Sequence, residues 1–239
     1  MAMNSNNLVI GSGLLAKAFA GGLTINENVC IYAAGVSNSS CKDTHEFMRE
    51  RQRLSKALEQ RMEAQTFVYF GTCSVDDPEA KNTAYVQHKL EMEQLVSAHP
   101  TYLILRLPQV AGTTPNPHTL LNYLYARIAR SEAFSLWIRA RRNIIDVDDA
   151  ASIAQLLIKD KSRRNVILNI ANAVSYSMMQ IVSAMEKVVG KSGIFDVEER
   201  GSEYSINIDP ILPVINKLDI NFGDEYLEKV INKYYGKLN

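Results

Sequence analysis

A tyrosine and a lysine stand one helical turn apart in the stretch NTAYVQHKLEMEQLV, residues 82–96. The helical spacing of its apolar residues predicts an amphipathic helix with Tyr85, Lys89, Met92 and Val96 on one face. Burying an ammonium group is costly unless it is paired or used, so either this end of the helix faces solvent or Lys89 has a function. In a functional pair, the cation would lower the pKa of the Tyr85 phenol, which could then exchange a proton with a substrate hydroxyl or carbonyl.

A hydroxyl at the end of a central strand would complete such a site, and Thr72 in YFGTCS has that position. A Tyr-x-x-x-Lys pair alone is common by chance and usually lies on a solvated helix face. Here it occurs together with a glycine-rich turn and alternating strands and helices, which favours the catalytic interpretation. A thiol nucleophile at Cys73 is disfavoured, because no histidine stands in a supporting motif and His88 points off the functional face of its helix.

The second candidate feature is a glycine turn at residues 11–16, GSGLLA, which fits the dinucleotide fingerprint G-x-G-x-x-[GA]. In that pattern Gly11 makes the turn, Gly13 lets the backbone approach a pyrophosphate, and the small Ala16 allows the helix to pack closely on the strand. The helix N-terminus would add amide donors. A glycine-rich turn with no ligand is the alternative. The acidic residue that usually follows about 20 residues on is not evident, because VCIYAAG ends in small residues.

The elements that must position these residues alternate along the chain. Apolar runs predict buried strands within 7–13, 28–35, 66–74 and 101–112. Between them we expect a short helix at 14–23 that Gly21 and Gly22 end, a helix at 42–62 with Phe47, Leu54 and Leu58 inward, and the helix at 82–96. Beyond residue 112 we expect a strand at 142–147 and helices at 120–131, 149–159, 176–190 and 224–238, with a polar, strand-like stretch before the last helix.

This alternation predicts an α/β fold, a shortened Rossmann-like doubly wound parallel sheet with a small C-terminal lobe. We expect residues 1–112 to form the dinucleotide-binding core. Residues 113–239 would be mainly the substrate-binding lobe, with 143–170 returning to the core.

The composition bounds the class of protein. With 239 residues, 46% hydrophobic and 22% charged, the chain is ordinary for a globular protein. Lysine plus arginine and aspartate plus glutamate balance at 26 each, which gives no electrostatic footprint for nucleic acid or an anionic membrane. No signal peptide or spanning segment is evident, so we expect a cytoplasmic location. Cys30, Cys41 and Cys73 lack metal-ligand spacing, so we expect reduced thiols and no metal site.

Six stretches in order resemble the extended short-chain dehydrogenase/reductases, the NAD-dependent epimerase/dehydratase family that acts on nucleotide sugars. The likeness covers most of the chain. The stretches are VIGSGLLA (9–16), CIYAAGVSNS (30–39), VYFGTCSV (68–75), AYVQHKLEME (84–93), LRLPQVAG (105–112) and RNIIDVDDAASI (142–153).

The resemblance implies that Tyr85 is the acid/base, that Thr72 hydrogen-bonds the reacting oxygen, and that Lys89 holds the nicotinamide ribose and keeps Tyr85 acidic. It implies that NAD or NADP, which the sequence does not distinguish, contacts Gly11, Ser12, Gly13, Leu14, Leu15, Ala33, Ala34, Gly35, Lys89 and Pro108. Arg142 would clamp the substrate diphosphate, a task that suits a planar bidentate donor, although a surface charge is the alternative. Besides Thr72, the polar residues that would reach the nucleotide or sugar are Gln109, Asn116 and Asn122.

The resemblance also implies a function: a nucleotide-sugar epimerase or 4-keto-reductase in bacterial surface polysaccharide synthesis. It suggests a homodimer through the helices around Glu46 to Leu58 and Tyr85 to Val96. Two alternatives remain. One is a non-catalytic family member that serves as a binding or partner subunit, and the other is a reductase of a small non-nucleotide carbonyl.

The chain departs from the family pattern in three places. Only about 20 residues separate the glycine turn from AAG, so a strand-helix-strand unit is missing. If the first strand connects directly to its neighbour on the other side by a right-handed crossover, the first helix would move to the opposite face of the sheet. Alternatively, the strand VCIYAAG pairs with the first strand on the side where the missing strand would be. Cys73 and Ser74 replace the Asp-Glu pair of sugar-nucleotide 4,6-dehydratases, which argues against that activity. The 12 residues between Thr72 and Tyr85 form a short loop that trims one wall of the site.

Overall fold

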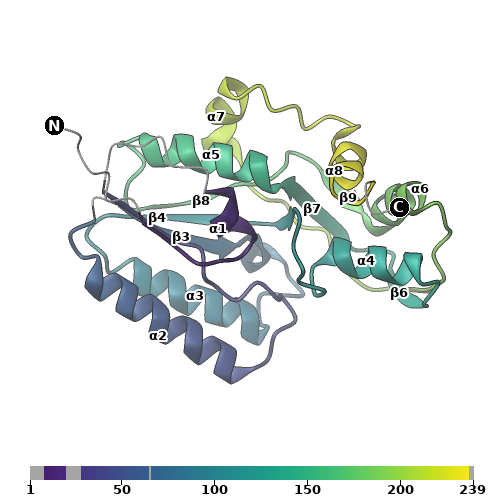
Figure 1. Ribbon diagram of the computed structural model, residues 1–239, viewed down its shortest axis with the longest axis horizontal. Helices are drawn as coiled ribbons and strands as arrows, with labels where there is room; N and C mark the ends of the chain where they lie inside the picture. Colours follow the sequence, from purple (N-terminus) through teal and green to yellow (C-terminus); the bar gives the residue numbers. More distant parts are fainter. Residues whose placement is uncertain (1–7, 20–27, 65, 237–239) are drawn as a thin grey trace.

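The computed structural model describes residues 8–19, 28–64 and 66–236. Figure 1 shows a central sheet between two layers of helices, with a smaller lobe at one end of the sheet. The expectation that Gly21 and Gly22 end the first helix lies outside the described residues.

The central sheet has five parallel strands in the order β1-β2-β3-β4-β8. All seven residues of β3 are buried, as expected of a strand covered on both faces. The predicted parallel, Rossmann-like fold is confirmed. The strands are β1 (Leu8–Ile10), β2 (Val29–Tyr32), β3 (Thr66–Thr72), β4 (Tyr102–Leu107) and β8 (Val166–Asn169).

Two pairs of helices cover the sheet. Helices α2 (Thr44–Gln60) and α3 (Ala84–Val96) lie on one face, and α1 (Leu14–Ala18) and α5 (Val147–Lys159) lie on the other (Figure 1). Alternate side chains of the strands supply one apolar cluster on each face, because successive strand residues point to opposite sides. The sequence marks two of the helix starts: Asp43 caps α2 through the amide of His45, and Thr83 caps α3 through the amide of Val86.

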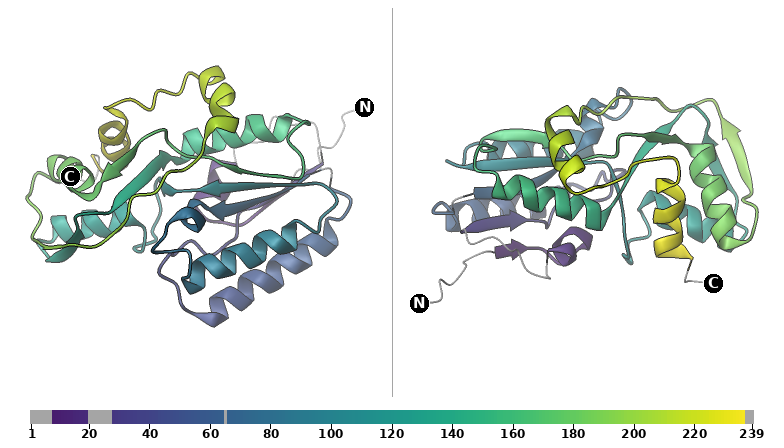
Figure 2. Two further views of the ribbon diagram at one scale, coloured as in Figure 1. Left: turned by 180° about the vertical axis from the view of Figure 1, so that it is seen from behind. Right: turned by 90° about the horizontal axis from the view of Figure 1, so that it is seen from above.

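The strand that ends in AAG, β2, lies between β1 and β3, and β1 is the edge of the sheet (Figure 2, right). The alternative in which this strand replaces the missing one is therefore wrong. The expected right-handed connection is also not found. The steps from β1 to β2 and from β2 to β3 go in the same direction across the sheet, yet α1 and α2 lie on opposite faces. Helix α1 is therefore not on the face where a right-handed connection would place it.

The position of α1 has a packing reason. Phe19, directly after α1, is 2% exposed and stacks on Phe70 of β3 with ring centroids 5.8 Å apart. The helix also packs against α5. Burying a phenylalanine there stabilises the fold by about 2 kcal/mol. On the other face, the apolar surface of the sheet is covered by α2 and α3.

The smaller lobe departs from the sequence prediction at its strands. The predicted strand 101–112 divides at Pro108 into β4 and a short strand that joins the smaller lobe, because proline has no amide to donate to a sheet. Strands β6, β8 and β9 were not predicted, and β9 takes the first residues of the helix expected at 176–190. The lobe contains β5 (Gln109–Ala111), β7 (Arg141–Asp146) and β9 (Ser175–Ser177) in one sheet, and β6 (Phe134–Trp137) and β10 (Phe195–Glu198) in another. Its helices are α4 (Leu120–Ala129), α6 (Met178–Val189) and α8 (Tyr226–Tyr235). Helix α7 (Leu212–Lys217) packs against α5 of the core (Figure 1). Two 3-10 turns also contact the core: η1 (Cys73–Asp76) contacts α3, and η2 (Asp209–Ile211) contacts β8.

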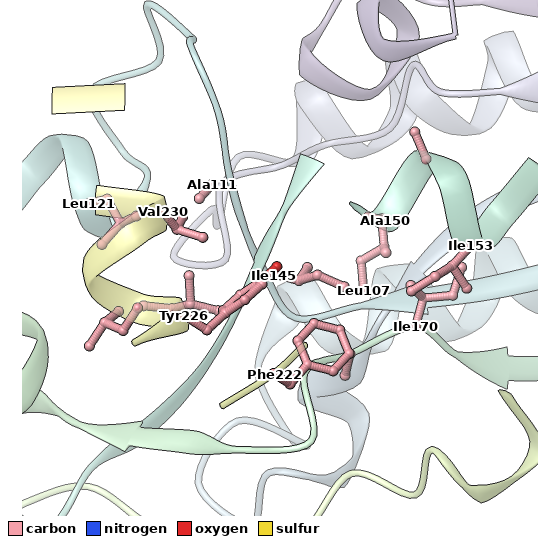
Figure 3. Close-up of a cluster of buried hydrophobic side chains, with 14 of the residues drawn as sticks. Leu107, Ala111, Leu121, Ile145, Ala150, Ile153, Ile170, Phe222, Tyr226 and Val230 are labelled. Atoms are coloured by element: carbon pink, nitrogen blue, oxygen red, sulfur yellow. The ribbon is translucent and has the colours of Figure 1, made fainter. Parts of the chain in front are cut away.

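The C-terminal helix α8 joins the two parts of the molecule. Figure 3 shows Tyr226 and Val230 of α8 in one apolar cluster with Ile145 of β7 and Ala150 of α5. Asp146 adds polar contacts, because its carboxylate accepts hydrogen bonds from the Tyr234 hydroxyl at 2.6 Å and the Lys233 ammonium at 2.7 Å. Within residues 8–19, 28–64 and 66–236, no helix is long and apolar enough to span a membrane.

Candidate active site

A pocket of about 290 Å³ lies at the carboxyl ends of the central strands. All strands of this sheet are parallel, so their carboxyl ends meet at one edge, where ligands of doubly wound folds bind. The pocket brings together residues from four separate predictions: the glycine turn, the AAG segment, the Thr72 strand and the Tyr85 helix. The predicted site residues that line it are Gly13, Leu14, Leu15, Ala33, Gly35, Thr72, Tyr85, Lys89, Pro108, Gln109 and Asn116.

The two glycines of the turn have different surroundings. Gly11 has a φ of +139°, and a Cβ there would lie 2.4 Å from the carbonyl oxygen of Ala33. Only glycine fits at that position, because both the backbone conformation and the close approach to the AAG segment exclude a side chain. A Cβ on Gly13 would meet nothing within 4 Å, because Gly13 faces the open pocket. Gly11 therefore shapes the turn and Gly13 leaves room beside it.

Tyr85 and Thr72 meet at the floor of the pocket. Tyr85 is 7% exposed, and the Thr72 side chain is within hydrogen-bonding reach of its hydroxyl. Burial raises the pKa of Tyr85 well above its usual value; the hydrogen bond from Thr72 acts against this, and the negative charge of Glu50 adds to it. Thr72 is held in place, because its hydroxyl oxygen also accepts a hydrogen bond from the amide of Ser74 at 3.1 Å. Tyr85 is thus a neutral phenol beside a fixed hydroxyl.

Lys89 is buried, and its charge is paired. Its side chain is 4% exposed, and its ammonium lies 3.2 Å from the carboxylate of Glu50 in α2. It also lies 4.7 Å from the centre of the Tyr69 ring, within the range of a cation–π contact. The structure thereby decides how the helix tolerates a lysine on its apolar face. It also differs from the expectation that Lys89 lowers the pKa of Tyr85, because Glu50 offsets the cation and burial dominates.

Cys73 lies next to Thr72 and is fully buried. Burial and the nearby charge of Asp76 raise the pKa of its thiol far above the usual value, so the thiol is protonated and unreactive. This agrees with the sequence argument against a thiol nucleophile. Within the described ranges, no group of histidine, cysteine and acidic residues could hold a metal ion.

The other predicted site residues do not line the pocket: Gly11, Ser12, Ala34, Asn122 and Arg142. The Asn122 amide donates to the carbonyl oxygens of Thr114 at 2.9 Å and Asn116 at 2.8 Å, two residues that line the pocket. Asn122 therefore contacts the pocket wall from behind and does not line the pocket itself. Arg142 lies in β7, where its guanidinium donates to the carbonyl oxygen of Arg141.

Sequence reasoning missed Glu50, which none of the motifs contains. The signal was present: Glu50 lies three residues after Phe47 and four before Leu54, on the inward face predicted for this helix. A charged residue on an apolar face calls for a partner, which is the argument that singled out Lys89. Other pocket residues absent from the motif matches come from the segment after residue 113 and include Thr114, His118 and Thr119.

Comparison with known proteins gives a family match and several similar structures. The model of the NAD dependent epimerase/dehydratase family matches residues 27–171. No curated protein matches the chain.

Three solved structures illustrate the structural similarity. RMD from Pseudomonas aeruginosa, complexed with NADPH, is 13% identical, with 98% of each chain covered and a TM-score of 0.71. A variant of UDP-glucuronic acid 4-epimerase from Bacillus cereus, in complex with UDP-4-deoxy-4-fluoro-glucuronic acid and NAD, is 17% identical, with 89% of this chain and 76% of that chain covered and a TM-score of 0.70. UDP-glucose 4-epimerase from Thermotoga maritima, with UDP-glucose, is 18% identical, with 88% and 78% covered and a TM-score of 0.66. At these identities the likeness shows the fold.

Proposed function

The chain belongs to the NAD dependent epimerase/dehydratase family, and from this premise we propose that it is an NAD(P)-dependent nucleotide-sugar epimerase or 4-keto-reductase. One observation carries the proposal: Thr72, Tyr85 and Lys89 line a single pocket together with the open face of the glycine turn. A hydroxyl, a phenol and an ammonium at a glycine-lined pocket suit proton transfer beside a bound dinucleotide.

The residues present fit the pyrophosphate and nicotinamide parts of a dinucleotide. Gly13 leaves space that a side chain would fill, and the backbone of Leu14 and Leu15 faces the same space. Lys89 would hold the nicotinamide ribose, and Pro108 would lie near the nicotinamide ring. When bound, the cofactor supplies a carbon that accepts or donates hydride. Among the described residues, no strand lies beyond β1 to hold the adenosine ribose, so NAD and NADP are equal candidates.

The residues of the chain would handle the proton. Tyr85 retains its proton in this structure, which suits donation to the oxygen of a carbonyl that is being reduced. Thr72 would hydrogen-bond the same oxygen and keep it within reach of Tyr85. In the reverse direction the Tyr85 phenolate would take the proton of a sugar hydroxyl, and the hydrogen bond from Thr72 would stabilise that charge.

The substrate side of the proposal rests on family likeness and on Arg142. The two epimerases named above were solved with UDP-glucose and with a UDP-glucuronic acid analogue, and we propose a nucleotide sugar here as well. Arg142 would clamp its diphosphate, and Gln109 would contact the nucleotide or sugar from the pocket. Cys73 and Ser74 after Thr72 argue against a 4,6-dehydratase. Surface-polysaccharide synthesis, a cytoplasmic location and a homodimer through α2 and α3 remain part of the proposal.

The decisive experiment is a titration of the purified protein with NADH and NADPH, followed by nicotinamide fluorescence. Saturable binding of either supports the enzyme, and oxidation of the bound cofactor by a panel of 4-keto nucleotide sugars then identifies the reductase. If neither dinucleotide binds, the proposal fails and the alternative of a non-catalytic partner subunit gains support. The position of β1 at the sheet edge, with no described strand beyond it, is the observation that favours that alternative.

A further inference from the structure

Glu50 is the most heavily bonded buried charge near the pocket. Its side chain is 1% exposed, and both carboxylate oxygens are used. Oε1 accepts hydrogen bonds from the Tyr69 hydroxyl at 2.9 Å and the Lys89 ammonium at 3.2 Å. Oε2 accepts one from the amide of Val36 at 2.7 Å and lies 3.0 Å from Nε2 of His88. These partners come from β3, from α3 and from the segment after β2.

The carboxylate limits the orientations that the Lys89 ammonium can adopt. An ammonium group has three N–H donors. One is directed to Glu50, and the ring face of Tyr69 lies beside the group at 4.7 Å from its centre. Because Lys89 also lines the pocket, a remaining donor can face a ligand there.

Gly35 shows how tightly this arrangement is packed. A Cβ on Gly35 would lie 2.7 Å from the Lys89 nitrogen and 2.8 Å from Oε1 of Glu50. The backbone of the AAG segment therefore packs directly against the ion pair. Together with the hydrogen bond to Val36, this contact ties the segment to both charged residues.

We propose that Glu50 is a positioning residue for the dinucleotide: it balances the charge of Lys89 and holds the ammonium with one donor directed at the cofactor ribose. This inference rests on the proposed function. It adds to that function a residue from α2, which none of the recognised motifs contains. An uncompensated ammonium at this depth would be strongly destabilised, so Glu50 keeps Lys89 charged and in place.

The groups that face Glu50 determine whether its carboxylate is charged in the pH range of the assay. From α3 these are Lys89 and His88, and from the sheet they are the hydroxyls of Tyr69 and Tyr32. Burial acts to raise the pKa of Glu50, but Lys89 and three hydrogen bonds outweigh it and lower the pKa to about 2. The carboxylate is therefore charged at every pH at which the protein would be assayed, and the ion pair persists.

The test measures the dissociation constant of NADH, or of NADPH if only that binds, between about pH 6 and 9 for Glu50→Gln and the parent. We expect binding to weaken at least about tenfold near neutral pH, since a positioned charge-assisted donor is lost. The deficit should grow as the pH rises, because a buried ammonium without its counter-charge gives up its proton more readily. The parent should show no such trend.

Two further variants separate positioning from simple damage. Glu50→Asp keeps the charge on a shorter side chain, so we expect weaker binding without the new pH trend; it also serves as the test if Glu50→Gln does not fold. Glu93→Gln is the matched control, because Glu93 is 4% exposed and paired with Arg106 at 2.7 Å but does not line the pocket. It should lose stability and bind the dinucleotide as the parent does.

The outcomes are distinct. Parent-like binding by Glu50→Gln across the pH range overturns the inference and leaves the proposed function standing, and so does an equal loss of affinity in Glu93→Gln. If only Glu50→Asp folds, parent-like binding by that variant overturns it. If the parent binds neither NADH nor NADPH, the proposed function fails and the inference falls with it.

Discussion

The two walls of the pocket are built very differently. The α3 wall consists of Thr72, Tyr85 and Lys89, supported by Glu50, and all four side chains are buried. It stands on a seven-residue strand and helices of 13 and 17 residues. The edge wall consists of β1, the glycine turn at residues 11–13 and α1. It has a three-residue strand, whose residues are all partly exposed, and a five-residue helix.

The difference shows where each kind of precision is needed. Proton transfer requires groups held to a fraction of an ångström, and the α3 wall holds them with buried ion pairs and hydrogen bonds. A pyrophosphate needs only backbone amides and space, which a short turn can supply if its glycines allow it. The wall with the shorter elements is therefore the one whose proposed task depends least on side chains.

The comparison predicts that chemistry depends on the α3 wall alone. Tyr85→Phe should lower turnover by about 10²- to 10⁴-fold, because it removes the proton donor. Cofactor affinity and melting temperature should change little, since only one hydroxyl is lost. Initial rates with a nucleotide-sugar substrate and a thermal melt check this. Tyr125→Phe, outside the pocket, serves as the control. Unchanged turnover in Tyr85→Phe would show that Tyr85 is not the proton donor.

The walls should also differ in what they contribute to stability. Ile104 of β4 is fully buried, and Ile10 of β1 is partly buried against the same apolar cluster. We expect Ile104→Ala to lower the free energy of unfolding by about 2–5 kcal/mol, and Ile10→Ala by about 1 kcal/mol. Denaturant unfolding of the two variants measures this. Equal losses would show that the edge strand is as firmly packed as the centre.

Acid should weaken the α3 wall through Glu50. Its pKa of about 2 in the folded protein lies below its ordinary value of 4.5. Its contribution is therefore fully present above pH 4.5 and is lost as the pH falls toward 2, with a total of about 3 kcal/mol. Between these pH values, the unfolding free energy of the parent should fall more steeply than that of Glu50→Gln. Parallel curves in denaturant unfolding would contradict the strength of the ion pair.

The two glycines of the edge wall should have different roles: Gly11 in stability and Gly13 in dinucleotide binding. Gly11→Ala places a Cβ against Ala33 at a positive φ, so we expect it to lower the unfolding free energy by about 1–3 kcal/mol and to weaken dinucleotide binding. Gly13→Ala has free space, so it should keep the stability of the parent and weaken binding only. Unfolding curves and NADH titrations of both variants test this. If Gly13→Ala binds as the parent does, the pyrophosphate does not lie there.

The smallest effect concerns the other lobe. Arg142→Ala should weaken nucleotide-sugar binding about tenfold, the order expected for one lost charge-assisted contact. Cofactor affinity should not change, because Arg142 does not line the pocket. Calorimetric titration with a nucleotide diphosphate measures this. An unchanged affinity would favour a small non-nucleotide carbonyl as the substrate.

Elements with a clear local sequence signal were predicted correctly, and elements without one were missed. Strands and helices between residues 28 and 107 were foreseen, because buried parallel strands form continuous apolar runs and the helices begin at capping residues. Strand β8 was missed, since its four residues include the exposed Ile167 and resemble a connecting segment. Pro108 lacks an amide, which the sequence shows and which explains why the fourth predicted strand divides there. The sequence does not show that β4 pairs in the central sheet while β5 pairs with β7 in the smaller lobe.

The sequence by itself determined the central groups of the pocket, because Tyr85, Lys89, Thr72 and Gly13 lie within short local motifs. Only the tertiary structure decided how they are connected. It placed β2 between β1 and β3, left α1 on the face opposite α2, and paired Lys89 with a carboxylate 39 residues away. Strand order, helix face and long-range ion pairs depend on contacts between segments far apart in the chain, which no local spacing encodes.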